Sequence, residues 1–353
     1  MTIVNFMPVY AQAPVSLRLL EEHVGMARDR AQAEDVCLLL PRDSALAEAF
    51  EGSSAPMDAG LGFLYGNDSA VEVALAGFNP VPTGPRGSAA TPLVSGEEWL
   101  LGDSSSKYVW PEGTTASVKV PARTTGRELL VALGVPEEGL KALYLGYPQS
   151  VFITPDKLDE PLELSCDYVR AFTTESCMVQ ALAEIARTFH HESCGHCVYG
   201  HEGGFQVGTI LMDITEKKGA AGDLALLRDL CPTMARLALC DVGRTLARTV
   251  LQALGLFGDE IEAHITKRQC PAGECKAFMT YHILISRCNG CGACLDACED
   301  DAIMGKPGFV HVIDQRRCTH CDRCCTACPQ GAIVMAGAKK PKTPPRPIPC
   351  RVR

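Results

Sequence analysis

The fold of this chain is decided by two cysteine runs, CNGCGACLDAC at 288–298 and CTHCDRCCTAC at 318–328. Each run has the form C-x2-C-x2-C-x3-C, and nineteen residues separate the two. A short loop of this kind brings three thiolates to one point, and iron accepts soft thiolate ligands from several directions. The duplicated pattern therefore predicts a domain built around two metal–sulfur centres.

This pattern is typical of a bacterial-type ferredoxin domain with two 4Fe–4S clusters, in which the fourth cysteine of each run ligates the other cluster. That rule assigns one cluster to Cys288, Cys291, Cys294 and Cys328, and the other to Cys298, Cys318, Cys321 and Cys324. A pair of zinc knuckles is the alternative, because C-x2-C pairs also bind zinc. Zinc, however, gains nothing from two complete runs of four cysteines.

Two residues depart from the usual pattern. Glu299 stands where a proline usually follows the fourth cysteine, and Cys325 is a surplus thiol. Charge near a cluster tunes its potential, so Glu299 could lower that of the adjacent cluster.

The composition narrows the class of protein. A chain of 353 residues, 46% hydrophobic and 21% charged, has room for two to four globular domains. Nineteen cysteines with metal-type spacing indicate a reducing, cytoplasmic compartment, and the net charge of −9 argues against a nucleic-acid partner. The N-terminus has no signal-peptide pattern and no apolar run reaches about 18 residues, so we expect no membrane span.

The apolar periodicity and the Gly- and Pro-rich stretches predict an α+β multidomain chain. The first hundred residues should be α/β, with residues 1 to about 35 helical, a strand at 35–41 and mostly loop at 52–96. The Pro-rich tail should be extended or mobile, with Cys350 a free thiol without a partner. The expected parts are an α/β region at 1–100, a small domain of short strands around one helix at 101–174, a helical bundle at 175–268, the ferredoxin domain with its linker at 269–336 and the tail at 337–353.

Two further groups of residues could bind metal. Cys194 and Cys197 form a C-x2-C with His196 and His201 beside them, which suits zinc or an iron–sulfur centre. His264, Cys270 and Cys275 could hold a structural zinc, and two buried thiols in a turn are the equal alternative. The fourth zinc ligand would be Cys231 or His282. The remaining cysteines, Cys37, Cys166 and Cys177, are expected in the core.

Residues 55–335 resemble the flavin-carrying, NADH-oxidising subunit of respiratory complex I. They are most similar to its relatives in bifurcating hydrogenases and NAD-dependent formate dehydrogenases, which add a ferredoxin module. The matching stretches are CMV at 177–179, FHHESCGHC at 189–197, LALCDVG at 237–243 and KRQCPAGEC at 267–275. LGYPQSVFITPDKLDEPL at 145–162 resembles that family's β-grasp segment, which implies a β-grasp-like domain over 101–174.

The resemblance implies a third cluster, in the helical bundle. Its ligands would be Cys194, Cys197, position 200 and Cys240, but position 200 is glycine. His201 could substitute, as histidine replaces cysteine in Rieske centres. His196 and Cys231 are less favoured substitutes, and the alternative is that the cluster is lost and the thiols pack or bind zinc.

The same resemblance implies that the flavin and nucleotide sites are absent. The family holds FMN and NADH over a glycine-rich loop, and no such loop precedes residue 55. The family's CGEE segment corresponds to YGNDSAVEVALAG at 65–77, so its acidic pair has become Asn67–Asp68. TGPRGSAA at 83–90 is a weak phosphate loop. Residues 1–100 are therefore interpreted as a degenerate remnant of the flavin/NADH-binding domain, with FMN and NAD absent.

These inferences predict an iron–sulfur electron-transfer subunit of a cytoplasmic multisubunit oxidoreductase. Its partners would be a catalytic subunit and an electron donor or acceptor, with ferredoxin among the candidates. The alternatives are a shortened FMN-dependent NADH dehydrogenase and a structural docking scaffold.

Overall fold

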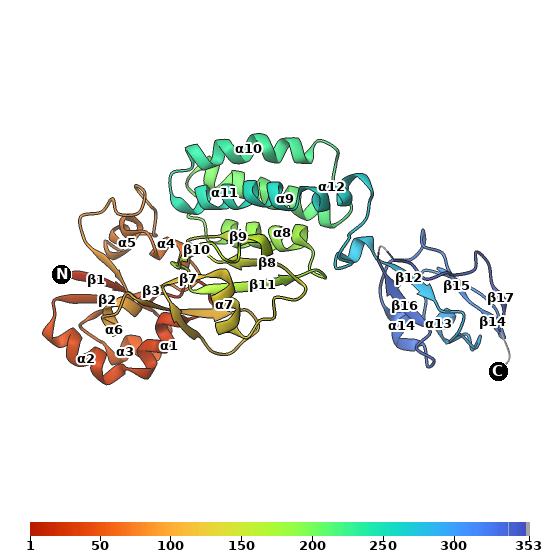
Figure 1. Cartoon of the computed structure of the whole chain (residues 1–353), viewed down its shortest axis with the longest axis horizontal. Helices are drawn as coiled ribbons and strands as arrows, with labels where there is room; N and C mark the ends of the chain where they lie inside the picture. The colour runs from red at the N-terminus through yellow and green to blue at the C-terminus, as the bar shows by residue number, and fades with distance from the viewer. Residues whose placement is uncertain (338, 351–353) are drawn as a thin grey trace. The chain divides into compact units, whose positions relative to one another are not determined.

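The computed structural model describes residues 1–337 and 339–350 (Figure 1). The expected tail at 337–353 thus lies partly outside the described residues, at 338 and 351–353. The chain forms two compact units. The first unit comprises Met1–Ser176, Ala181–Met212 and Gly222–Gly258, and the second comprises Cys177–Gln180, Asp213–Ala221 and the chain from Asp259 onward.

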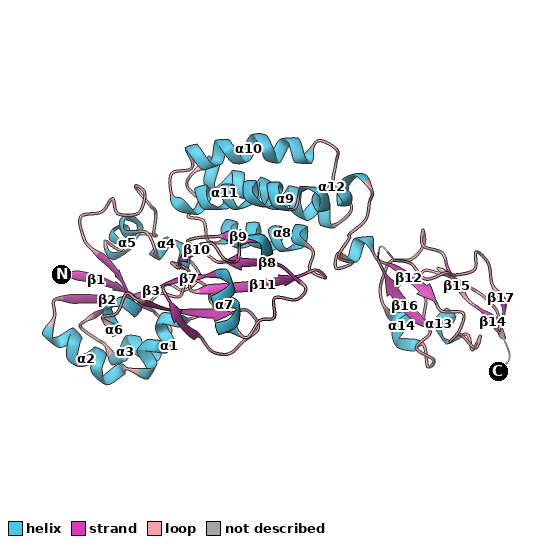
Figure 2. Cartoon of the chain, viewed as in Figure 1, coloured by secondary structure: helices cyan, strands magenta, loops and turns pink. Residues whose placement is uncertain are grey.

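The first unit begins with a four-stranded, all-parallel sheet of order β3-β2-β1-β4. Helices α1–α6 connect or flank its strands, so the predicted α/β class of this region is confirmed (Figure 2). Its strands are β1 Thr2–Asn5, β2 Val36–Pro41, β3 Ser54–Met57 and β4 Leu93–Ser95. Its helices are α1 Val15–Glu22, α2 Val24–Ala33, α3 Ala45–Ala49, α4 Gly62–Tyr65, α5 Asp68–Leu75 and α6 Gly96–Leu101.

One local prediction for this region is wrong and one is incomplete. Residues 1–35 are not helical throughout, because residues 2–5 form strand β1 and the first helix starts only at Val15. The stretch 52–96 is mostly loop, as predicted, but it also contains β3, α4, α5 and β4. The Asn67 side chain caps α5 by accepting hydrogen bonds from the backbone N–H groups of Ser69 and Ala70, a signal masked by the Gly and Pro around it.

A second, mixed sheet of order β6-β5-β11-β8-β9 follows in the first unit. Helix α7 packs on it through Leu129 and Leu130, and Thr125 and Glu128 form a capping box at the start of this helix. The apolar runs of this stretch predict short strands around one helix, and these elements belong to the same compact unit as the parallel sheet. Its elements are β5 Ser106–Pro111, β6 Val118–Pro121, β7 Arg123–Thr125, α7 Gly126–Leu133, β8 Leu140–Leu145, β9 Val151–Ile153, the 3-10 turn Pro155–Lys157, β10 Pro161–Glu163 and β11 Tyr168–Thr173.

The following stretch is helical, as its apolar spacing predicts. In the first unit α11 lies against β9, where Gln252 exchanges two hydrogen bonds with the backbone of Phe152, at 2.8 and 2.9 Å. The helical elements are α8 Met178–His191, the π-helical turn Val198–Glu202, α9 Gly203–Thr215, α10 Asp223–Leu237, α11 Asp241–Leu256 and α12 Gly258–Thr266.

Most of the second unit consists of three short antiparallel strand pairs and two short helices around a core that includes Ile283, Val310 and Ile333. Part of the tail is extended, as predicted, since Ile348–Pro349 forms β17 and pairs with β14. The elements are the 3-10 turn Lys276–Phe278, β12 Thr280–Ile283, α13 Ala293–Asp296, β13 Ile303–Met304, β14 Phe309–Val310, β15 Val312–Ile313, α14 Arg323–Ala327, β16 Ile333–Ala336 and β17 Ile348–Pro349.

In the part of the chain that the structure describes, no helix has the length and hydrophobicity needed to cross a bilayer.

Candidate metal centres

The two cysteine runs of the second unit adopt matching loops. In the first loop Gly290 and Gly292 have positive φ, and in the second His320 and Asp322 occupy the same positions with φ of 58° and 63°. Non-glycine residues in this conformation carry strain of about 1–3 kcal/mol, and such strain concentrates at functional sites. The Tyr281 hydroxyl donates to the Asp322 carboxylate and helps to hold the second loop in this shape.

The eight cysteines of the two runs all lie in the second unit. Burial raises the pKa of Cys294 to about 12, and the charges of Cys288, Cys328 and Cys291 add to the effect, so these four residues lie in one neighbourhood. Burial likewise raises the pKa of Cys318, and the charges of its neighbours Cys321 and Cys298 add to the effect. Burial also raises the pKa of Cys324, and the charges of Cys318 and Cys321 add to this effect.

The halves of the domain also match in their hydrogen bonds to sulfur. The Ala302 N–H donates to Cys298 Sγ and the Ala332 N–H to Cys328 Sγ, both at 3.3 Å. Cys298 and Cys328 are the fourth cysteines of their runs, each assigned to the cluster of the other run. Hydrogen bonds to ligand sulfurs are one means by which a protein sets the potential of a cluster.

The two unusual residues of the runs have neighbours that spacing did not reveal. Glu299 forms an ion pair with Arg323, whose hydrogen bond lowers the pKa of the Glu299 carboxyl. An opposite charge therefore lies beside Glu299 and opposes its expected effect on the adjacent cluster. Burial raises the pKa of the Cys325 thiol to about 12, and its neighbour Cys324 adds to the effect.

A separate site in the second unit consists of four buried side chains, Cys177, His264, Cys270 and Cys275, whose ligand atoms all lie within 4.8 Å of one another. Cys177 Sγ is 3.4 Å from Cys275 Sγ and 3.4 Å from His264 Nε2, and Cys275 Sγ is 3.6 Å from the same nitrogen. Tetrahedral zinc, with bonds of about 2.3 Å to sulfur and about 2.0 Å to nitrogen, requires S···S and S···N separations of roughly 3.8 and 3.5 Å. The spacing therefore suits a single tetrahedral ion.

The fourth member of this site is Cys177, which sequence reasoning placed in the core. It is neither Cys231 nor His282. Cys231 belongs to the first unit, and the His282 ring hydrogen-bonds to Thr280. Cys177 lies 87 residues before His264, so no local spacing relates the two.

The groups around this site orient its ligands. His264 Nδ1 is 2.8 Å from the carbonyl oxygen of Glu260, which assigns the proton to Nδ1 and leaves the Nε2 lone pair facing the thiols. The Cys177 N–H donates to the Glu274 carboxylate at 2.6 Å. Hydrogen bonds from Cys177 and Cys275 lower the pKa of Cys270, so one thiolate is favoured among the three thiols. A closed set of four protein ligands is typical of structural rather than catalytic zinc.

The third group of cysteines lies in the first unit. Burial raises the pKa of Cys240, and the charges of Cys194 and Cys197 add to it, so these three thiols are neighbours. The Gly200 N–H donates to Cys197 Sγ at 3.1 Å, and a Cβ at position 200 would lie 2.6 Å from that sulfur. The position of the missing family ligand thus faces the Cys197 thiol, and a side chain there would require that sulfur to shift.

The two histidines beside this group are engaged elsewhere through Nδ1. His201 Nδ1 lies 2.6 Å from Ser193 Oγ, which leaves Nε2 as its atom for a metal. The His201 ring also lies 4.5 Å from that of His190. His196 is exposed, and its Nδ1 is 2.6 Å from the Cys194 carbonyl oxygen.

In the first unit, the glycine-rich stretch 83–90 is folded onto the start of α5. The Asp68 carboxylate accepts hydrogen bonds from Gly87 N–H at 2.9 Å and from Ala89 N–H at 2.7 Å. Two further N–H groups of the stretch donate to Ser69 Oγ. A phosphate-binding loop needs its N–H groups free to face the phosphate. Here at least four of them are used within the chain.

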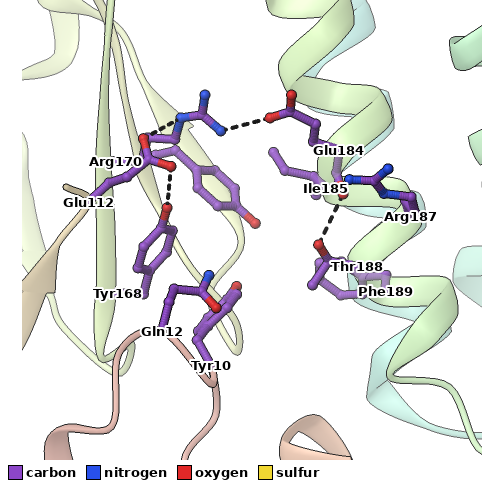
Figure 3. A pocket seen from close by; sticks show the side chains of 11 residues that line it. Tyr10, Gln12, Glu112, Tyr168, Arg170, Glu184, Ile185, Arg187, Thr188 and Phe189 are labelled. Atoms are coloured by element: carbon purple, nitrogen blue, oxygen red, sulfur yellow. Dashed lines mark hydrogen bonds and ion pairs between the residues drawn. The ribbon is translucent and has the colours of Figure 1, made fainter. Parts of the chain in front are cut away.

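A cavity of about 220 Å³ lies between the second sheet and α8 (Figure 3). Its charged groups pair with one another, since Arg170 binds Glu112 at 2.7 Å and Glu184 at 3.0 Å, and the Tyr168 hydroxyl donates to Glu112. Pockets for cofactor-sized ligands usually enclose about 300–1,000 Å³. This cavity is therefore small for a flavin nucleotide. It is lined by Tyr10, Gln12, Glu112, Tyr144, Tyr168, Arg170, Glu184, Ile185, Arg187, Thr188 and Phe189.

The chain is similar to known redox proteins. A 27% identical relative, the NADP-reducing hydrogenase subunit HndC of Solidesulfovibrio fructosivorans, aligns over 60% of this chain and 48% of its own length. An NADH-quinone oxidoreductase subunit of Streptomyces coelicolor is 28% identical over 58% of this chain and 51% of its own. The chain thus spans about half the length of these relatives.

Solved structures share the fold. A chain of the NAD+-reducing NiFe-hydrogenase in its H2-reduced state matches with a TM-score of 0.59 and 19% identity, covering 75% of this chain and 57% of that one. Residues 180–264 match the family model of the NADH-ubiquinone oxidoreductase-F iron-sulfur binding region, and residues 287–332 match that of the 4Fe-4S dicluster domain. The chain thus contains a region similar to the iron–sulfur binding region of NADH-ubiquinone oxidoreductase F, followed by a 4Fe–4S dicluster domain.

Proposed function

We propose that this chain transfers electrons within a multisubunit oxidoreductase and has no flavin or NADH site of its own. The observation that carries the proposal is the pair of interleaved cysteine groups in the dicluster domain, each with four thiols of the type that iron requires. One cluster would bind Cys288, Cys291, Cys294 and Cys328, and the other Cys298, Cys318, Cys321 and Cys324. When bound, these clusters accept and donate single electrons.

Two further centres belong to the proposal. Cys194, Cys197 and Cys240, with His201 as a candidate fourth ligand, would hold a third iron–sulfur cluster. The site of Cys177, His264, Cys270 and Cys275 would hold zinc, which would cross-link three segments of the second unit next to the dicluster domain.

Three observations support the absence of a flavin site. Asp68 and Ser69 engage the N–H groups of the glycine-rich stretch that a phosphate would otherwise bind. The Asn67 side chain is likewise engaged within the chain, because it accepts the hydrogen bonds that cap α5. The cavity beside Arg170 is small and internally paired. The substrate chemistry would then take place on a partner subunit, as the names of the relatives, a hydrogenase subunit and a quinone oxidoreductase subunit, suggest.

A second candidate function is a shortened FMN-dependent NADH dehydrogenase. The all-parallel N-terminal sheet with its flanking helices favours it, because nucleotides commonly bind at the carboxyl ends of parallel strands. A docking scaffold with clusters that serve only structure remains a third candidate; its clusters would not undergo reversible reduction.

The deciding experiment is metal and flavin analysis of the anaerobically purified chain, combined with low-temperature EPR. Two clusters predict about eight irons per chain, and a third 4Fe–4S cluster predicts about twelve. We expect one zinc and no flavin. Flavin near one per chain, with NADH-dependent dye reduction, would establish the second candidate instead. Zinc in place of iron in the dicluster domain would refute electron transfer by this chain.

A further inference from the structure

The C-terminal tail is tied to the loop that holds the first cysteine group. Strand β17 pairs with β14, and the Cys350 N–H donates to the Gly308 carbonyl at 2.8 Å. The Gly308 N–H in turn donates to the Gly290 carbonyl at 3.1 Å. Gly290 lies between Cys288 and Cys291, so one residue, Gly308, connects the tail strand to the metal-binding loop.

This arrangement places a fifth thiol in a group of four. Burial raises the pKa of Cys350 and its neighbour Cys288 adds to the effect, and both side chains pack against the core of the domain. The sequence prediction of an unpartnered thiol is therefore wrong. Cys350 lies 62 residues beyond Cys288 and outside both cysteine runs, so motif spacing does not associate the two.

We propose that Cys350 is a reserve ligand of the cluster assigned to this group and can replace Cys288 on the same iron. The inference rests on the proposed ligation by Cys288, Cys291, Cys294 and Cys328. In the exchange the iron–sulfur bond to Cys288 breaks and one to Cys350 forms, while the proton of the Cys350 thiol passes to the departing Cys288 sulfur. The cluster keeps its oxidation state and its total charge, so no oxidant or reductant is needed.

The exchange is geometrically local. The Cys288 and Cys350 side chains pack against the same core, and the tail is joined to the domain there by a strand pair of only two residues. Such a reserve would keep the cluster bound when Cys288 is oxidised or otherwise lost, since iron retains four thiolates.

Cys325 offers a matched contrast in the second group. It too is a surplus thiol in contact with a proposed ligand, Cys324, but both residues lie on helix α14. Consecutive helical side chains point about 100° apart, so Cys325 is not directed along the bond that Cys324 would make. We therefore expect no rescue in that group.

The test compares iron and acid-labile sulfide per full-length chain, with EPR of the reduced protein, across variants. Cys288→Ala and Cys350→Ala should each keep the wild-type iron content. Cys291→Ala, Cys324→Ala and the double variant Cys288→Ala/Cys350→Ala should each lose about four irons, or keep a three-iron cluster with its own EPR signal. Unchanged zinc content would show that each variant is folded.

The proposal is overturned if Cys288→Ala loses as much iron as Cys291→Ala, or if the double variant keeps the wild-type amount. Failure of the underlying function has a different signature. If Cys291→Ala loses no iron, or if the wild-type chain holds no 4Fe–4S cluster, then the ligand assignment itself fails and the reserve role fails with it.

Discussion

Replacing Cys177 with alanine removes one corner of the four-ligand site in the second unit. Structural zinc sites contribute apparent binding free energies of about 10–16 kcal/mol, so one ligand of four corresponds to roughly 3 kcal/mol and a loss of affinity of about a hundredfold. The Cys177–Glu274 hydrogen bond uses the backbone N–H and is retained in the variant. The variant therefore tests the loss of the sulfur ligand alone, because the hydrogen bond near the start of α8 is kept.

The assay is a competition titration of the full-length, anaerobically prepared protein with a chromogenic zinc chelator, with iron measured in the same samples. Cys231→Ala is the matched control. Cys231 is also fully buried and its chain position made it a candidate ligand, but it lies in the first unit. We expect the Cys177 variant to lose zinc to the chelator at about a hundredfold lower chelator concentration than the wild type. The Cys231 variant should bind zinc as tightly as the wild type.

Two results would refute this reasoning. A Cys177→Ala chain that holds zinc as tightly as the wild type would show that the sulfur 3.4 Å from His264 Nε2 is not a ligand. Zinc loss confined to Cys231→Ala would restore the assignment suggested by the sequence alone.

Three further predictions concern other regions. Asp68→Ala should destabilise the first unit by roughly 3 kcal/mol, because two backbone N–H groups lose a charged acceptor. Unfolding monitored by tryptophan fluorescence measures this loss, since both tryptophans lie in that unit. The control variant Asp58→Ala, at an exposed position, should change the free energy of unfolding little. Glu299→Gln should raise and Arg323→Gln lower the potential of the adjacent cluster by on the order of 10 mV, with the double variant near wild type in redox titration. Burial lowers the pKa of His311 below its ordinary 6.5, so its contribution to stability is full above that pH and is lost as the pH falls. His311→Leu should flatten the decline in denaturant midpoint below pH 6.5, and an unchanged slope would contradict this.

Local patterns predicted much of the fold. The strand at 36–41, the helical stretch after Met178 and the dicluster domain follow from apolar period and cysteine spacing, which depend on neighbours within one turn or loop. The helix α5 was missed because its evidence is a single cap, Asn67, within a segment rich in turn residues. Strand β1 was missed because four residues carry too little period to separate strand from helix.

The sequence by itself determined the 4Fe–4S dicluster domain and predicts its interleaved cysteine groups, because ligands that share a loop are separated by only two residues and the run occurs twice. Only the tertiary structure decided that Cys177 completes the zinc-type site, that Cys350 meets Cys288 and that Arg323 faces Glu299. These pairs are joined by packing between distant segments, and a one-dimensional spacing holds no information on which buried thiols or surface charges such packing will bring into contact.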